Sequence, residues 1–277
     1  LALRLPADWL ATAAFPVVVD PLLAAVDING GVSITDVAIA HDPLGNANVW
    51  YAVARAIGTD TDLWLYRADE DGSNAILVYS DLTTTWGIED PSLGVSRAGA
   101  ASLLAYTRHT WATDVKRVRL HAHDRADLAF NTSWFHGDLS GLNTWRPVVG
   151  SDLSTTAPTS LLLAYQAEST GTFADVATSR IHAYYVDVAA KIALGNPFAI
   201  ADAPNSDNER PTIAKVAAGP LRVWTVGCQR ANNVLLLGTW DVVLRRVDGT
   251  NVSGEFAIDS QLDRHEFAPR LAGLNGF

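Results

Sequence analysis

The chain has 277 residues, of which 48% are hydrophobic and 18% charged, and this composition excludes a disordered protein. Its formal net charge of −10 disfavours a nucleic-acid partner, and its single cysteine excludes a disulfide framework or a cysteine-based zinc site. No apolar run reaches the roughly 18 residues that a membrane-spanning helix needs. The chain contains no methionine, even at position 1, so we expect it to be a piece of a longer precursor.

The first 31 residues read as a junction segment that precedes the main domain of residues 32–277. Pro6 and Asp8 are typical of the first turn of a helix, which we predict over residues 6–14. The helix ends before Phe15-Pro16, because the residue before a proline avoids the helical region. The β-branched run that follows predicts a strand over residues 15–20.

The main domain repeats one pattern, with similar starts at residues 36–40, 90–94, 146–150, 210–214 and 268–272. After each of the first four starts comes a second apolar strand, then an alternating third strand that ends near an acidic turn. In the fourth unit these are residues 221–225 and 242–246, followed by Asp248. A fourth strand leads to the next start. Four strands per unit of roughly 40–60 residues is typical of propeller blades.

We therefore predict an all-β propeller of four complete blades and a partial fifth, whose inner strands line a central channel. A β-sandwich is the competing all-β interpretation. The sequence favours five-bladed closure, in which residues 15–20 share a sheet with residues 270–272, because an open blade edge invites aggregation. The alternatives are that the chain is cut from a larger propeller or is completed by another chain.

The fourth unit carries a resemblance to a known class of repeat. Residues 196–201 (NPFAIA), 209–214 (ERPTIA), 221–224 (LRVW) and 241–249 (DVVLRRVDG) resemble the degenerate propeller repeats of large bacterial secreted and cell-surface proteins. Residues 5–10 and 15–21 are similar to a junction segment that precedes such repeats. The resemblance implies a propeller fold and an extracellular or cell-surface location, and it implies no particular reaction.

Residues just before each start are expected to gather at one mouth of the channel. The candidate binding residues are Asp36, Glu89, Asp90, Trp145, Arg146, Glu209 and Arg210. Five-bladed glycosidases use carboxylates at such positions, one as acid and one as base or nucleophile, and this makes Asp36, Asp90 and Glu209 the catalytic candidates of a glycosidase. The favoured interpretation is that Arg146 and Arg210 neutralise these acids in a purely structural ring.

Calcium is the one cofactor that the sequence suggests. Asp69, Asp71 and Asn74 place oxygen ligands at alternating positions around Gly72. The loop lacks the distal bidentate Glu of a full calcium site, so a hairpin turn is the favoured interpretation and no metal site is predicted.

Two further motifs receive structural interpretations. His121 and His123 lie on the same face of a predicted strand beside Asp124, and we expect both to face solvent rather than to bind a metal. Cys228 is expected to be a small buried hydrophobic side chain.

These observations lead to three hypotheses about function. The first is a non-enzymatic structural or binding module of a secreted or cell-surface bacterial protein, with protein or glycan partners. The second is a glycoside hydrolase or lyase with its carboxylates at the channel mouth. The third is a subunit of an extracellular filament or sheath, completed by strand addition through an open blade edge.

Overall fold

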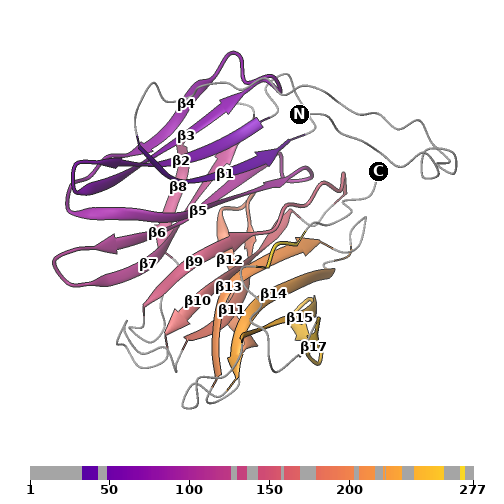
Figure 1. The fold of residues 1–277 in the computed structure, drawn as a ribbon. Coiled ribbons are helices and arrows are strands. Elements are labelled where there is room, and N and C mark those ends of the chain that lie inside the picture. Colours follow the sequence, from indigo (N-terminus) through magenta and orange to yellow (C-terminus); the bar gives the residue numbers. More distant parts are fainter. Residues whose placement is uncertain are drawn as a thin grey trace, which may run out of the picture.

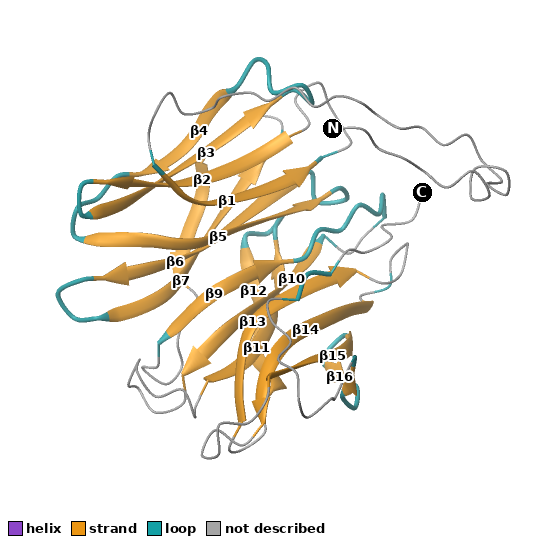
Figure 2. Ribbon diagram, viewed as in Figure 1, coloured by secondary structure: helices purple, strands orange, loops and turns teal. Residues whose placement is uncertain are grey.

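A computed structural model describes residues 33–42, 49–125, 130–135, 143–156, 159–168, 179–202, 206–215, 221, 223–232, 240–258 and 269–271. In this part of the chain, all regular structure is β-strand (Figure 2). None of it forms a helix suited to crossing a membrane. The predicted helix over residues 6–14 and the predicted strand over residues 15–20 lie outside the described residues.

The strands form four antiparallel sheets that follow one another along the chain (Figure 1). The first sheet contains β1 (Ile34–His41), β2 (Val49–Ile57), β3 (Asp60–Ala68) and β4 (Ile76–Asp81). The second contains β5 (Trp86–Ser96), β6 (Ala101–Thr110), β7 (Val115–Asp124) and β8 (Phe130–Phe135). The third contains β9 (Thr144–Val149), β10 (Ser160–Glu168), β11 (Ser179–Asp187) and β12 (Ile192–Ala201). The fourth contains β13 (Ser206–Lys215), β14 (Val223–Asn232) and β15 (Trp240–Asp248), with the short β16 (Asn251–Val252) and β17 (Phe256–Ala257) both paired to β15.

Each sheet is a meander of neighbouring strands, and the first strands of successive sheets contact one another. Strand β1 lies against β5, β5 against β9, and β9 against β13. The predicted all-β fold and its four-strand unit are therefore confirmed, and the arrangement is propeller-like. Residues 269–271 are not in a strand, and the proposed partner strand over residues 15–20 lies outside the described part, so five-bladed closure stays a prediction.

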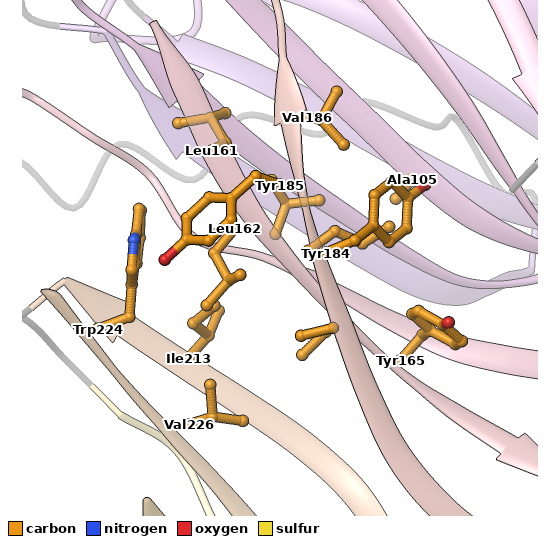
Figure 3. Packing of buried hydrophobic residues seen from close by; sticks show 14 of the residues in the cluster. Ala105, Leu161, Leu162, Tyr165, Tyr184, Tyr185, Val186, Ile213, Trp224 and Val226 are labelled. Atoms are coloured by element: carbon orange, nitrogen blue, oxygen red, sulfur yellow. The ribbon is translucent and has the colours of Figure 1, made fainter. Parts of the chain in front are cut away.

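The largest hydrophobic cluster runs through the second, third and fourth sheets. Strand β10 is buried along its whole length, because other sheets cover both of its faces. Figure 3 shows Tyr165 and Tyr184 on one side of the cluster and Ile213 and Trp224 on the other. Trp224 lies on a second strand and is fully buried, as the sequence predicted.

Ion pairs join neighbouring sheets where the inner strands end. Lys215 Nζ lies 2.5 Å from Asp152 Oδ2, and both side chains are almost completely buried. Between the first two sheets, Arg125, which follows β7, forms a bidentate ion pair with the buried Asp42 at the end of β1. Charges buried in this way are stable only when paired, so these contacts fix how the sheets stack.

Candidate functional site

The inner strands of the second, third and fourth sheets each contain a β-bulge at the same point. On β5, Glu89 pairs with Thr107 and Ser92 with Ala105, so that two residues face one on β6. The bulge occurs there because proline has no backbone N–H to donate to the ladder. Register shifts at the same place occur on β9 and β13.

The residue before each of these prolines has a left-handed backbone. The φ angles of Asp90, Arg146 and Arg210 are 51°, 47° and 51°. Such angles are uncommon for residues other than glycine and cost free energy, and they concentrate at functional sites. Three charged residues at equivalent points of three sheets share this conformation, which marks the inner-strand bulges as a candidate site.

The bulges border a cavity of about 440 Å³ where the inner strands meet. Its volume is within the roughly 300–1,000 Å³ that is typical of small-molecule sites. The lining comes from β1, β5, β9, β13 and residues 270–271, and its charged members are Asp36, Asp90, Arg146, Arg210 and Arg270. The structure therefore brings together four of the seven residues that the sequence analysis selected and adds Arg270.

The two acidic side chains of the cavity have different surroundings. Asp90 Oδ2 accepts a hydrogen bond from Thr107 Oγ1 at 3.2 Å. Burial raises the pKa of Asp90, Glu89 and Asp36 raise it further, and the Arg146 guanidinium acts in the opposite direction. Asp36 is exposed, and its Oδ1 accepts the backbone N–H of Val37 at 2.8 Å. Asp90 is thus the acid of this cavity that is suited to hold a proton.

Glu209 is not among the residues that line the cavity, but it forms an ion pair with Arg146, which is. Arg146 Nη1 donates to Glu209 Oε2 at 3.1 Å and to Gln166 Oε1 at 3.2 Å. Gln229 Nε2 donates to the same Glu209 oxygen at 3.3 Å. The structural ring that the sequence suggested therefore exists for Arg146 and Glu209.

Sequence reasoning missed Asp207, which lies on the same strand two residues before Glu209 and so on the same face. Asp207 is 1% exposed. Burial raises the pKa of Asp207 to about 7, and the neighbouring Glu209 carboxylate contributes in the same direction. The alternation of two acids in a strand was the signal that could have identified this pair.

Two more of the selected residues are not among those that line the cavity. Glu89 accepts hydrogen bonds from Lys116 Nζ at 2.5 Å and from a ring nitrogen of His109 at 3.3 Å. Trp145 is only 8% exposed and is packed in the hydrophobic interior. The expectation that Glu89 and Trp145 belong to the mouth needs this correction, because residues one position before the bulge do not line the cavity.

The loop with calcium-type ligands is a turn closed by its own hydrogen bonds. Asn74 Nδ2 donates to Asp69 Oδ2 at 2.7 Å, and the Ser73 backbone N–H donates to Asp71 Oδ1 at 2.9 Å. The residues described by the structure contain no group of three side chains suited to hold a metal ion.

The expectation for His121 and His123 was wrong, since both side chains are fully buried rather than solvent-facing. The His121 ring lies 4.3 Å from that of Tyr79, and the His123 ring lies 6.1 Å from that of Trp50. The first sheet covers this face of β7, so both rings belong to the packing between sheets. Cys228 is buried as predicted, and burial raises the pKa of its thiol to about 12.

No protein-family model and no curated protein matches the chain. Among solved structures, the fold is similar to that of an α-L-arabinanase from Penicillium chrysogenum complexed with arabinobiose, with a TM-score of 0.55 and 13% identity over 81% of this chain and 66% of that one. It is also similar to an α-L-arabinofuranosidase from Fusarium graminearum complexed with arabinobiose, with a TM-score of 0.55 and 12% identity over 82% of this chain and 67% of that one.

The chain spans about two thirds of the length of these two enzymes. At 12–13% identity the likeness shows a shared fold. It also overturns the first functional hypothesis, a non-enzymatic structural or binding module, because the similar structures are glycoside hydrolases.

Proposed function

We propose that this protein is a glycoside hydrolase whose reaction takes place in the cavity between the inner strands. The observation that carries the proposal is the placement of two carboxylic acids, Asp36 on β1 and Asp90 on the adjacent β5, in the lining of one cavity. Glycoside hydrolysis needs two such groups, one that holds a proton and one that does not. The similarity in fold to an arabinanase and an arabinofuranosidase supports this assignment.

The surroundings of the two acids assign their roles. Asp90 has the raised pKa, so it donates a proton to the oxygen of the leaving sugar as the glycosidic bond breaks. Asp36 is exposed to the cavity and acts on the opposite side of the anomeric carbon, either as nucleophile or as the base that takes a proton from attacking water. Arg146 acts on Asp90 through its charge, and its ion pair with Glu209 holds its guanidinium in place.

The test is the release of reducing ends from a panel of polysaccharides that includes arabinan, galactan and xylan. We expect turnover of at least one glycan, and we expect Asp90→Asn and Asp36→Asn to lower its rate by about 100-fold or more. Both variants are expected to keep binding the glycan, because they change charge rather than shape. Absence of turnover across the whole panel would contradict the proposal.

Asp248→Asn is the matched control for these variants. Asp248 is an exposed acid that pairs with Arg246 and lies outside the cavity lining. The control removes the same charge and is expected to leave the rate unchanged. Equal losses in the control and in the two cavity variants would contradict the assigned roles.

We further propose five-bladed closure and an extracellular or cell-surface location, as the repeats and their resemblance imply. Support for a fifth unit comes from Leu271, whose backbone N–H donates to Thr212 Oγ1 at 3.0 Å. Val149 makes the equivalent bond to Ser92 Oγ, also at 3.0 Å, two units earlier. Deletion of residues 1–31 is expected to destabilise the whole domain; a truncated chain that melts like the parent would contradict closure by this segment.

A further inference from the structure

We propose that the cavity takes a glycan containing a uronic acid, whose carboxylate is bound by Arg210 and Arg270. This inference rests on the proposed function, since it names the substrate class of the same site. It starts from the charges of the lining, which are not mixed at random around the cavity. Asp36 and Asp90 lie on the adjacent strands β1 and β5, whereas Arg146 and Arg210 lie on β9 and β13.

Arg270 extends the basic side of the cavity. The hydrogen bond of Leu271 to Thr212 fixes residues 269–271 against β13, next to Arg210. The chain has a net charge of −10, yet one side of the cavity lining is basic. Three successive inner segments each contribute one arginine to it, namely Arg146, Arg210 and Arg270. An acidic side and a basic side in one cavity suit a ligand that presents a carboxylate to one and a glycosidic oxygen to the other.

The three arginines differ in whether a carboxylate of the protein already pairs with the guanidinium group. Arg146 is paired with Glu209 and is therefore neutralised. Arg210 and Arg270 are both exposed, and among the residues that the structure describes neither forms an ion pair with a carboxylate. Arg270 Nη1 lies 3.5 Å from the carbonyl oxygen of Pro269. As far as the structure describes the chain, both guanidinium groups are available to a ligand.

Arginine is the side chain suited to a planar carboxylate, because its fork of N–H donors matches the two oxygens. A neutral arabinose or galactose unit would leave both guanidinium groups without a charged partner. A hexuronate unit supplies that partner without adding much bulk to the sugar. The charge arrangement therefore favours a uronate over a neutral sugar at the basic side.

The experiment measures binding of tri-galacturonate to the full chain by calorimetry and compares it with the fully methyl-esterified trisaccharide. The ester keeps the shape of the sugar and removes its charge. We expect the free acid to bind about 10- to 100-fold more tightly, as loss of a charge-assisted hydrogen bond implies, and to weaken as salt is raised. Equal affinity for acid and ester would overturn the inference, as would tighter binding of a sulfated galactan oligosaccharide.

Variants assign the effect to the two side chains. Arg210→Ala and Arg270→Ala are each expected to weaken tri-galacturonate binding by about 10-fold or more, with no change in affinity for the ester. Arg246→Ala removes another exposed arginine, which lies outside the cavity, and is expected to bind like the parent. Parental affinity in both cavity variants would overturn the inference.

Repeating the measurement in Asp90→Asn separates this inference from the proposed function. That variant is expected to bind tri-galacturonate without hydrolysing it. Selective uronate binding by a parent chain that hydrolyses no glycan would support the inference and contradict the hydrolase. Hydrolysis of a neutral glycan, with no preference for uronate in binding, would support the hydrolase and contradict the inference.

Discussion

The backbone N–H of Leu271 donates a hydrogen bond to Thr212 Oγ1 at 3.0 Å, which ties the last described segment to the inner strand of the fourth sheet. Leu271 also lies against the fourth sheet beside Gly227. The bond repeats the one between Val149 and Ser92 of the preceding units. A hydroxyl on one inner strand thus holds the backbone of the next segment around the cavity.

Removing either hydroxyl should therefore loosen the packing of successive inner segments. Thr212→Val and Ser92→Ala are each expected to lower the free energy of unfolding by about 1 kcal/mol, because each leaves an N–H without its acceptor. Chemical denaturation measures this change. Thr113→Val, in an exposed turn, is the control and should be neutral; a neutral Thr212→Val would show that residues 269–271 are not held by this bond.

The Trp224 ring fills the space beside Gly150, where an added Cβ would come within 2.3 Å of the ring. Trp224→Ala is expected to cost about 3–5 kcal/mol of stability, the range for a large aromatic residue removed from a core. Gly150→Ala is expected to cost about 1–3 kcal/mol through overpacking. Urea denaturation checks both values, and the double variant should lose less than the sum because the two changes share one space.

Gly254→Ala is the control for this pair, since an added Cβ there meets nothing within 4 Å. It should change stability by less than about 0.5 kcal/mol. An unchanged melting temperature in Trp224→Ala would contradict the burial of this side chain between sheets.

Removing one member of the buried ion pair between Lys215 and Asp152 is expected to lower the free energy of unfolding strongly. Replacing both members by apolar side chains is expected to lower it much less. Lys215→Met or Asp152→Asn alone should lower stability by about 3–5 kcal/mol, because each leaves one buried charge without its partner. The double variant Lys215→Met, Asp152→Leu should recover much of this loss. The exposed pair of Arg246 and Asp248 provides the comparison, since its disruption should cost less than about 1 kcal/mol.

Asp207 should make the protein less stable as the pH rises. Its pKa is about 7 in the folded chain and ordinarily 3.8, so the folded state holds a proton that the unfolded state has lost between these values. The stability that this proton confers is complete below pH 3.8 and is lost as the pH rises through 7, by up to about 1.4 kcal/mol per pH unit. Asp207→Asn should flatten the pH profile of the melting temperature across this window, whereas Thr113→Val, which changes an exposed side chain that does not titrate, should not. An unchanged profile in Asp207→Asn would contradict the raised pKa.

His121 and His123 should make the protein less stable as the pH falls, which is the opposite of the effect of Asp207. Burial lowers the pKa of His121 to about 2 and that of His123 to about 4, against an ordinary value of 6.5. As the pH falls below 6.5, the two histidines therefore bind protons in the unfolded chain but stay neutral in the folded chain. The folded state loses stability as the pH falls from 6.5 through these pKa values. His123→Gln should make the loss between pH 6.5 and 4 shallower in thermal melts. Thr113→Val, which changes an exposed side chain that does not titrate, should leave the slope as in the parent.

Much of the fold could be predicted because each unit of the repeat shows the same local sequence patterns. Alternation in residues 181–185, the apolar run at residues 161–165 and the prolines at the bulges depend on strand geometry and on the missing proline N–H, which act within a few residues. These features by themselves place Asp36, Asp90, Arg146 and Arg210 at equivalent points of the repeat. They also place Trp224 in the interior.

Tertiary structure decided the rest, because burial and charge pairing depend on what packs against a strand. The alternation around His121 and His123 looks the same whether a face meets water or another sheet, and only the stacking of the first sheet buries both rings. The partners of Glu89, Arg146 and Glu209 come from other strands, so their neighbours in sequence do not reveal which charges stay available to a ligand. The raised pKa of Asp207 and the contribution of Arg270 to the cavity arise in the same way, from contacts between distant segments.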